Sequence, residues 1–578
     1  MRHGMRRFAL LLIAAAVFSA CGRLRVDPAD SMNARVDAAL RAELGSKTRP
    51  VYVTADAEGA RLWKLTRAFY EKRGYQMAWV EDEEPRRQMD DLLGAIRKAD
   101  TEGLDPEAYG VSVLDRRRRE ASKGFLTKKG FEPVEAGRME VWLTYIYMKH
   151  SSDLADGFSD LAHADRTWRI QRERFDPLAH LEKALAENRV AESLQELTPD
   201  APQYRALREA LASHRKLAAA GGWPVLPGSL RVKPGQTSAN VTALARRLAA
   251  SGDYQERVPD TPMEYGDDVQ TAVKRFQQRH GLEPDGVVGR AVIAELNVPA
   301  DHRVRQIELN LERWRWLPRD LGARHILVNI PAYRLEVWDR GAVPLTMRVV
   351  VGRKDTPTPI FNDMMTHVVF SPYWNVPPEI AEDETLPAVM KDAAFLDRNN
   401  MEVVDAEGRR VDPATIDLED PAAYRFRQRP GASNSLGLVK FMFPNQFNVY
   451  LHDTPADSLF ARATRSFSHG CVRVEQPDAL AEYLLRDQAE WTRARIGEAM
   501  HAGEERRVDL EDPVPVYLGY WTAAAGPEGV EFRSDVYGID ARQAAQLAAR
   551  LARLHKSTAA GHSAGTNNKK PAKAGRTD

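Results

Sequence analysis

Hydrophobic residues recur at helical spacing through the first two hundred residues after a polar start. Residues at positions i, i+3 and i+7 form one apolar face: Leu62, Leu65 and Phe69. This period is typical of an amphipathic helix. Similar faces continue until Gly221-Gly222 breaks the pattern. The sequence therefore predicts a helical scaffold domain over residues 49–225, preceded by a polar linker over residues 21–48.

A second, shorter helical unit follows the break. One of its apolar faces has the spacing i, i+4 and i+7: Val269, Val273 and Phe276. A polar loop precedes this face, and the turn Pro284-Asp285-Gly286 follows it. We predict a compact three-helix unit over residues 226–300.

The period changes from helical to alternating after Trp316. Three runs alternate apolar and polar residues: His325–Ile330, Tyr333–Asp339 and Val343–Val351. This alternation predicts strands. We expect a β-rich domain over residues 301–554, with Arg313 and Arg315 on a solvated helix face before its first strand.

A polar, helix-prone stretch with several Pro and Gly interrupts the β-rich domain at about residues 380–435. A long insertion ahead of a reactive site is often a lid, so we predict that it caps the domain. The tail, residues 555–578, has few apolar residues and is predicted to be disordered. The predicted fold class is multidomain α+β, with a helical scaffold, a small three-helix module and a β-rich domain with a capping insertion.

The N-terminus has the pattern of a targeting segment. Arginines precede an uncharged apolar run of 11 residues, Phe8–Phe18. This run is shorter than the roughly 20 residues that a membrane-spanning helix needs, and it has the size of a signal-peptide core. Ser19-Ala20 leads into Cys21, which resembles a bacterial lipobox. We predict a lipoprotein signal peptide over residues 1–20 and lipidation of Cys21, with cleavage of a plain signal peptide as the alternative.

Charge and cysteine content narrow the function further. The chain has 578 residues, with 82 Lys+Arg against 82 Asp+Glu. It has no overall basic field, so nucleic acid is not expected as a partner. The sequence also contains no H-E-x-x-H or paired C-x-x-C motif, and we predict no metal or organic cofactor. Of the two cysteines, Cys471 has no intramolecular disulfide partner if Cys21 is acylated, so its thiol is either buried or used in chemistry.

The residues around Cys471 are those that a cysteine acyl-transfer site needs. Such a thiol requires an imidazole that accepts its proton, and both His469 and His452 precede it closely. Gly470 lets the backbone approach a developing oxyanion. Arg473 adds a positive charge that favours a thiolate or holds a carboxylate.

A predicted strand positions the more distant histidine. In this strand three alternate residues share one face: Asn448, Tyr450 and His452. His452 then lies at the strand end, where it can meet the returning loop that carries Cys471.

These residues resemble a known signature. His452, a spacer and Ser468-His469-Gly470-Cys471 are similar to the motif of L,D-transpeptidases with a YkuD-type catalytic domain. Residues 372–378 and 440–445 resemble the YcbB-like branch of that family, and residues 229–298 resemble a peptidoglycan-binding module. Arg473 replaces the asparagine that many members carry, so its role is left open.

The resemblance implies a role for each site residue. Cys471 would be the nucleophile and His452 its base, oriented by the backbone carbonyl of Asp453. His469 and Gly470 would belong to the nucleophile turn, with the N–H groups of Gly470 and Cys471 as oxyanion donors. Substrate would be bound by four further residues: Arg473, Tyr450, Trp374 and Asn448.

The resemblance also implies a reaction and partners. A tetrapeptide stem of peptidoglycan would acylate the cysteine and release D-Ala, and a second stem would accept the acyl group in a 3→3 cross-link. Carbapenem β-lactams would be covalent inhibitors. The chain would lie in the periplasm of a Gram-negative bacterium, contacting the membrane only through its N-terminal lipid.

Other functions stay open. With water as the acceptor the enzyme would be an L,D-carboxypeptidase, and with a protein lysine it would anchor lipoproteins to the wall. A wall-binding lipoprotein with an inert catalytic domain is a further alternative. A serine penicillin-binding enzyme has little support, because Ser213-His214-Arg215-Lys216 fits S-x-x-K but the chain lacks K-T-G.

Overall fold

The structure is a computed structural model that describes residues 32–81, 84–125, 131–158, 168–392, 394–412, 415, 424–526 and 528–564. The predicted signal peptide and the lipidation site Cys21 lie outside the described residues. Among the helices within these ranges, none has both the length and the apolar character that crossing a membrane requires.

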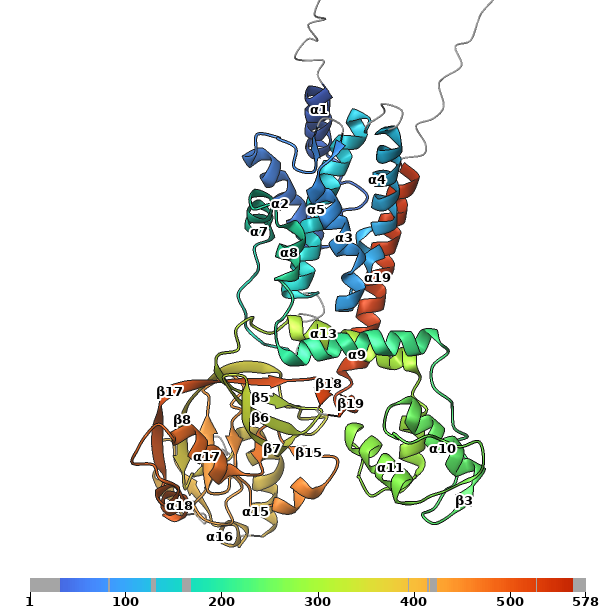
Figure 1. Ribbon diagram of the computed structural model, residues 1–578. Coiled ribbons are helices and arrows are strands. Elements are labelled where there is room, and N and C mark those ends of the chain that lie inside the picture. The colour runs from blue at the N-terminus through green and yellow to red at the C-terminus, as the bar shows by residue number, and fades with distance from the viewer. Residues whose placement is uncertain are drawn as a thin grey trace, which may run out of the picture.

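The N-terminal part is an upright helical scaffold built around α5 (Figure 1). Nearly every side chain of α5 is buried, including the charged residues Glu140, Lys149 and Asp153, as befits the central helix of a bundle. The elements of this part, α5 included, are α1 (Met32–Gly45), α2 (Ala57–Lys72), β1 (Val80–Glu81), β2 (Glu84–Pro85), α3 (Arg87–Arg97), η2 (Ala99–Glu102), η3 (Pro106–Tyr109), α4 (Val111–Phe125), α5 (Pro133–Asp156), α7 (Pro177–Ala186), α8 (Val190–Gln195) and α9 (Pro202–Ala219).

Helix α1 corrects the prediction that residues 21–48 are an unpatterned linker. Val36, Leu40 and Leu44 recur every four residues and are buried, and α1 packs along α5. The apolar stripe is only three residues long among charged neighbours, so its helical period is a weak signal in the sequence. The described part of this segment therefore belongs to the scaffold.

The last helix also belongs to the scaffold, although it follows the β-rich domain in sequence. Helix α19 (Ile539–Ala564) extends from the lower part of the molecule up beside α4 (Figure 1). It continues ten residues beyond the predicted end at Leu554, so the prediction of disorder from His555 is wrong as far as Ala564. Three alanines in this continuation favour it, because alanine has the highest helix propensity.

Helix α13 (Ala300–Arg315) crosses below the scaffold, packed against α9 (Figure 1). The prediction of a solvated face here is wrong, because the side chains of Arg313 and Arg315 are buried. Arg315 pairs with Glu312 at 2.5 Å, and Arg313 pairs with Asp540 of α19 at 2.6 Å. Buried charges require such partners, and α13 therefore joins the scaffold to the rest of the chain.

The three-helix module has a separate hydrophobic core. It contains β3 (Thr237–Ser238), α10 (Ala239–Ala250), β4 (Met263–Glu264), α11 (Asp267–Arg279) and α12 (Arg290–Leu296). Phe276, Val273 and Val269 of the predicted apolar face all lie in this core. The module forms the second of the two lower lobes (Figure 1).

The other lower lobe is built on one sheet of nine described strands, in the order β15-β7-β16-β14-β13-β8-β17-β5-β6. An additional pairing of β6 with β7 closes the sheet on itself. Its strands are β5 (Arg324–Asn329), β6 (Arg334–Asp339), β7 (Ala342–Gly352), β8 (Phe361–Phe370), β13 (Val439–Met442), β14 (Leu451–His452), β15 (Ser466–Ser468), β16 (Val472–Val474) and β17 (Arg506–Gly519). The other elements of this lobe are η7 (Asp457–Ala461), α17 (Pro477–Leu485), α18 (Arg493–His501) and the hairpin β18 (Ala523–Gly526)–β19 (Gly529–Phe532).

The insertion between β8 and β13 forms a small subdomain of its own, which we call the cap. Besides the expected helices it contains a four-stranded sheet in the order β11-β10-β12-β9. Its elements are β9 (Trp374–Asn375), α14 (Pro378–Ile380), η4 (Ala381–Thr385), α15 (Leu386–Lys391), α16 (Phe395–Arg398), β10 (Met401–Val404), β11 (Arg410–Val411) and β12 (Arg425–Gln428).

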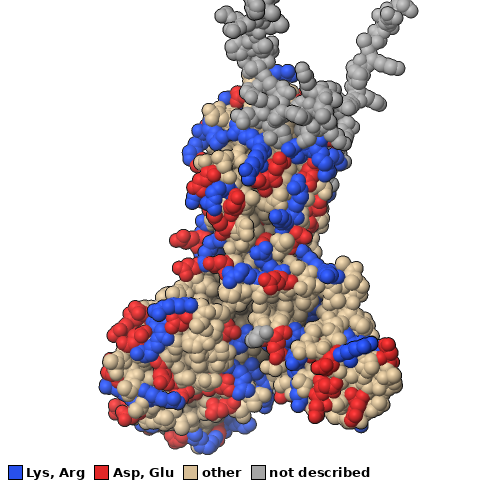
Figure 2. Space-filling model, viewed as in Figure 1, with Lys and Arg blue, Asp and Glu red and all other residues tan. Residues whose placement is uncertain are grey.

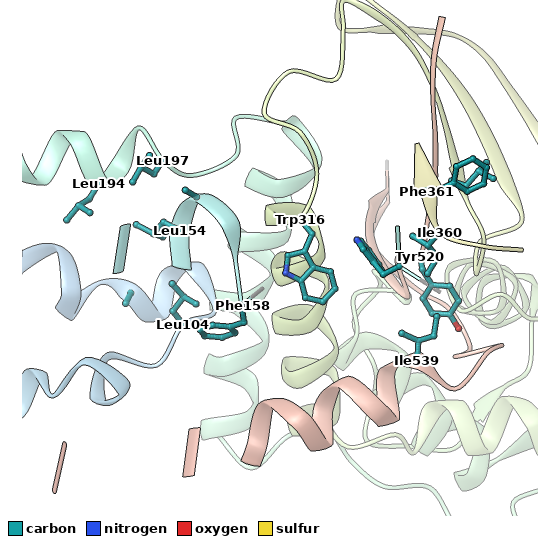
Figure 3. Close-up of a cluster of buried hydrophobic side chains, with 14 of the residues drawn as sticks. Leu104, Leu154, Phe158, Leu194, Leu197, Trp316, Ile360, Phe361, Tyr520 and Ile539 are labelled. Carbon is teal, nitrogen blue, oxygen red and sulfur yellow. The ribbon is translucent and has the colours of Figure 1, made fainter. Parts of the chain in front are cut away.

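One hydrophobic cluster joins the scaffold to the lobe built on the nine-stranded sheet. Figure 3 shows Trp316 between Leu154 and Phe158 on the scaffold side and Tyr520 and Ile360 on the other. The ring of Trp316 meets Trp168 edge to face at 4.7 Å. The predicted fold class is confirmed, with the refinement that its helical and β-rich parts share a core.

Candidate active site

Cys471 lies in a tight turn between β15 and β16. The Ser468 hydroxyl accepts the Gly470 N–H at 3.1 Å and donates to the Cys471 carbonyl at 2.5 Å. Gly470 has φ +123°, a conformation that favours glycine. From the other side, the Thr358 hydroxyl donates to the Gly470 carbonyl at 2.8 Å. The nucleophile turn is therefore held by two hydroxyl side chains.

This turn corrects one expectation about the oxyanion site. The Gly470 N–H is already bound by Ser468, so it is not available as an oxyanion donor in this structure. The Cys471 N–H has no hydrogen bond among the described residues. The Cys471 amide is thus the better-placed candidate.

His452 ends β14, which runs parallel to β16 and places His452 opposite Arg473. Its Nδ1 lies 2.5 Å from the Asp453 carbonyl oxygen. A carbonyl only accepts hydrogen bonds, so Nδ1 carries the proton and Nε2 of the neutral ring has a free lone pair. Burial, with a further contribution from Arg473, lowers the pKa of His452 to about 3. The imidazole is therefore neutral and able to accept a proton.

The backbone that orients His452 is fixed by the Asp453 side chain. Its carboxylate accepts the Leu438 N–H at 2.8 Å and the Thr454 N–H at 2.7 Å. Gly437, with φ +62°, packs so closely that an added Cβ would lie 2.3 Å from this carboxylate. The sequence resemblance implies a role for the Asp453 backbone carbonyl. It does not point to the Asp453 side chain or to Gly437, which fix the position of that carbonyl.

The surroundings of the Cys471 thiol shift its pKa in opposite directions. Its Sγ is 3.8 Å from the Asn448 carbonyl oxygen. Burial raises the pKa of Cys471, while hydrogen bonds from Tyr450 and the charge of Arg473 lower it in part. Among the described hydrogen bonds none joins the thiol to His452. Catalytic hydrogen bonds are often formed only when substrate is present.

Asn448 reaches the site differently from the prediction. The strand begins only at Leu451, because Asn448 has φ +53° and lies in a turn. The Asn445 side chain shapes this turn by donating to the carbonyls of Phe443 and Val449 at 2.6 and 2.7 Å. Asn448 therefore presents its backbone carbonyl to the thiol.

Arg473 brings a partly buried positive charge to the same place. Its Nε has no hydrogen-bond partner, and it forms no ion pair with any described residue. Burial lowers the pKa of Arg473, whereas the neighbouring Cys471 raises it. An unpaired guanidinium beside the nucleophile is suited to a carboxylate ligand.

The cap contributes the opposite side of the site. The ring Nε2 of His469 lies 2.8 Å from Glu384 Oε1 of η4. Trp374 of β9 is partly buried. Together with the nucleophile turn these residues border a cleft of about 900 Å³, which we call the catalytic cleft. Its lining includes seven of the eight predicted active-site residues: Cys471, His452, His469, Arg473, Tyr450, Trp374 and Asn448.

Thr358 and Glu384 were not singled out from the sequence. Thr358 lies in a Thr/Pro-rich run, and Glu384 is one of several acids in a helix-prone segment. Neither has a local signal, because each acts on a turn about one hundred residues later in the chain. No described group of His, Cys, Asp and Glu side chains is arranged to hold a metal ion.

A lone thiol, a neutral imidazole with a fixed tautomer and a backbone amide lie in one cleft, and these are the groups that a cysteine acyl-transfer site requires. Comparison with known families specifies which. Residues 323–515 match the family described as "L,D-transpeptidase catalytic domain", residues 237–296 match "Putative peptidoglycan binding domain", and residues 64–211 match "Scaffold domain". The chain therefore carries a YkuD-type L,D-transpeptidase catalytic domain and a peptidoglycan-binding domain, as the resemblance implied.

Individual proteins are similar over part of the chain. A Haemophilus influenzae protein named "Putative L,D-transpeptidase" is 35% identical over 239 residues, which are 41% of this chain and 48% of the relative. The chain thus spans about half the length of this curated relative. None of the matches tests the assignment to the YcbB-like branch, which stays a prediction.

Two solved structures are more distant. The L,D-transpeptidase of Xylanimonas cellulosilytica is 17% identical, with 50% of this chain and 98% of that chain covered and a TM-score of 0.18. The L,D-transpeptidase of Mycobacterium smegmatis is also 17% identical, with 34% and 58% covered and a TM-score of 0.16.

Proposed function

We propose that the chain is a cysteine-dependent L,D-transpeptidase that forms 3→3 cross-links between peptidoglycan stem peptides. The observation that carries the proposal is the pair in the catalytic cleft. Cys471 is the nucleophile. The Nδ1–H group of His452 donates to the Asp453 carbonyl, which leaves Nε2 unprotonated and able to accept a proton. The proposed donor is a tetrapeptide stem ending in D-Ala.

In the acylation step, Cys471 Sγ attacks the carbonyl carbon before D-Ala while His452 accepts the thiol proton. The Cys471 N–H donates to the developing oxyanion. As the C–N bond breaks, His452 returns the proton to the departing D-Ala amine, which leaves a thioester. A neutral His452 suits this cycle because it begins and ends without a proton on Nε2.

In the second step, an amine of a second stem's diaminopimelate attacks the thioester. His452 takes the amine proton and transfers it to the departing thiol. An amide bond forms, the C–S bond breaks and free Cys471 is regenerated. Arg473 is placed to hold a carboxylate of a stem peptide during either step, since it has no ion-pair partner among the described residues.

The remaining assignments belong to the same proposal. Export with lipidation at Cys21 would bring the enzyme to its substrate in the periplasm of a Gram-negative cell. Carbapenems are proposed inhibitors because their strained lactam acylates a nucleophile without releasing a leaving fragment. Water or a protein lysine as the acceptor gives the alternative carboxypeptidase and lipoprotein-anchoring activities.

The test uses the full-length chain in detergent with purified disaccharide-tetrapeptide, and mass spectrometry of the products. We expect a dimer lighter than two substrates by one D-Ala, and no dimer with Cys471→Ala. Cys21→Ala removes the other cysteine and is expected to retain the activity. Tripeptide without dimer would identify a carboxypeptidase instead. Unchanged substrate with every form would contradict the proposal and favour the wall-binding alternative.

A further inference from the structure

A second cavity, of about 760 Å³, separates the peptidoglycan-binding module from the catalytic lobe. One wall is the loop after α11, which includes residues 281–284. The opposite wall includes part of β7 and residues 461–465, which lead into β15 and so toward the nucleophile turn. Figure 2 shows a recess between the two lower lobes. We call this cavity the module cleft.

The two walls are held together by direct contacts beside the cleft. The Arg279 guanidinium of α11 donates to the Val530 carbonyl at 2.9 Å, and the Arg533 guanidinium donates to the Arg279 carbonyl at 2.6 Å. The rings of His280 and Phe532 lie 5.7 Å apart. The module is therefore docked on the β18–β19 hairpin, and the module cleft is a fixed part of the molecule.

Arginines outnumber acidic residues in the lining of the module cleft. Its lining contains five arginines and two glutamates: Arg334, Arg348, Arg462, Arg465, Arg533, Glu283 and Glu475. Arg348 pairs with Glu475, Arg533 pairs with Glu531 at 2.7 Å, and Arg334 pairs with both Glu531 and Glu336 at 2.9 Å. These three cations are therefore neutralised by the protein.

Arg465 and Arg462 differ, because neither forms an ion pair with a described residue. Arg465 donates to the carbonyls of Tyr333 at 3.1 Å, Val349 at 3.2 Å and Arg462 at 2.6 Å. Carbonyls orient a guanidinium without cancelling its charge. Burial, and then the neighbouring Arg348, lower the pKa of Arg465 to about 10.

We propose that the module cleft is a second binding site, which holds a carboxylate-bearing stem peptide of the peptidoglycan polymer. Arg462 and Arg465 supply the planar donors that bind carboxylates. Apolar lining residues such as Leu282 and Met347 offer contacts to the rest of the peptidoglycan. The inference rests on the proposed function, because peptidoglycan is chosen as the ligand on the ground that one wall belongs to the peptidoglycan-binding module.

The site would connect polymer binding to catalysis. Residues 461–465 continue into β15, and three residues after β15 comes Cys471. A peptidoglycan stem peptide held in the module cleft would therefore lie against the segment that carries the nucleophile turn, while a separate stem peptide occupies the catalytic cleft.

The test measures sedimentation of the full-length chain in detergent with purified peptidoglycan sacculi. Arg462→Glu reverses one exposed charge of the module cleft, and Arg493→Glu on α18 is the matched control outside both clefts. We expect at least fivefold weaker binding for Arg462→Glu and less than a twofold change for Arg493→Glu. Sacculi whose carboxyl groups have been converted to amides are expected to bind both the wild type and Arg462→Glu equally weakly.

Turnover of soluble disaccharide-tetrapeptide is measured in parallel, with thermal unfolding to verify that each variant is folded. We expect Arg462→Glu to keep wild-type turnover within twofold. Equal binding of the two proteins to untreated sacculi would overturn the second site, as would a difference that survives amidation. A binding difference without any turnover by the wild type would leave the site standing and contradict the transpeptidase assignment alone.

Discussion

Burial acts in opposite directions on the ionisation of the two groups proposed to react, Cys471 and His452. It raises the pKa of Cys471 and lowers that of His452 to about 3, and Arg473 opposes the first effect while adding to the second. At neutral pH the resting site therefore holds a thiol and a neutral imidazole. The proton moves when the thiol attacks, which differs from sites that store a thiolate–imidazolium pair.

This ionisation state predicts the pH dependence of thiol reactivity. In the Cys21→Ala chain we expect the rate of Cys471 alkylation by iodoacetamide to rise about tenfold per pH unit from pH 6 to 8. His452 is already unprotonated over this range, so no step near pH 6.5 is expected. Mass spectrometry of the modified chain measures the rate. A plateau that begins below pH 6 would show that a thiolate pair exists and would contradict this view.

Residue types and spacing were sufficient to select Cys471 and His452 as the proposed reacting pair, which the structure places in one cleft, but not the groups around it. The pair could be proposed from sequence because few residue types perform this chemistry. The burial of Arg313 could not be found, because its partners Asp540 and Gln543 are more than two hundred residues away in sequence. The engagement of the Gly470 N–H depends on a rotamer of Ser468, which no sequence pattern reports.

At the scale of elements, the catalytic cleft is assembled from short pieces. β14 is two residues long, and the turn before it is built by Asn445. The period-two pattern predicted β5, β6 and β7 closely because each pairs over six residues or more. It overestimated the strand before His452, where side-chain hydrogen bonds to the backbone replace strand pairing.

The cap is connected to the nucleophile turn through η4. Glu384→Ala removes the contact with His469, which is partly exposed and expected to be worth about 0.2–1 kcal/mol. Amide hydrogen exchange over Ala381–Lys391 should therefore become faster by up to about fivefold. Glu382→Ala, an exposed neighbour on the same element, is the matched control and is expected to leave exchange unchanged. Equal exchange in both variants would show that this contact does not hold the cap.

At the scale of the whole molecule, the scaffold is completed by residues from both ends of the described chain. Arg550 of α19 lies over the ring of Phe158 at 4.6 Å, and His555 contacts Asp105 at 2.6 Å. The domain division predicted from sequence could not include this, because hydrophobic patterns are local and α19 follows the catalytic domain.

A chain that ends at Gly538 tests the importance of α19. Arg313 would lose the acceptors of Asp540 and Gln543, and breaking a buried pair typically costs about 3–5 kcal/mol. We expect a lower thermal midpoint and rapid proteolysis within residues 32–220. A chain ending at Ala564, which keeps all of α19, is the control and should unfold like the full chain. Unchanged stability after removal of α19 would refute its structural role.

The position of α19 also has a consequence for biosynthesis. Residues of the scaffold leave the ribosome first, yet the helix that completes their packing is synthesised after both lower lobes. The contact between Asp105 and His555 joins positions 450 residues apart, and contacts of such separation form late in folding. A nascent chain would therefore keep part of its scaffold surface uncovered until translation is nearly finished. A chain that terminates early would never cover this apolar surface and would therefore be prone to aggregation.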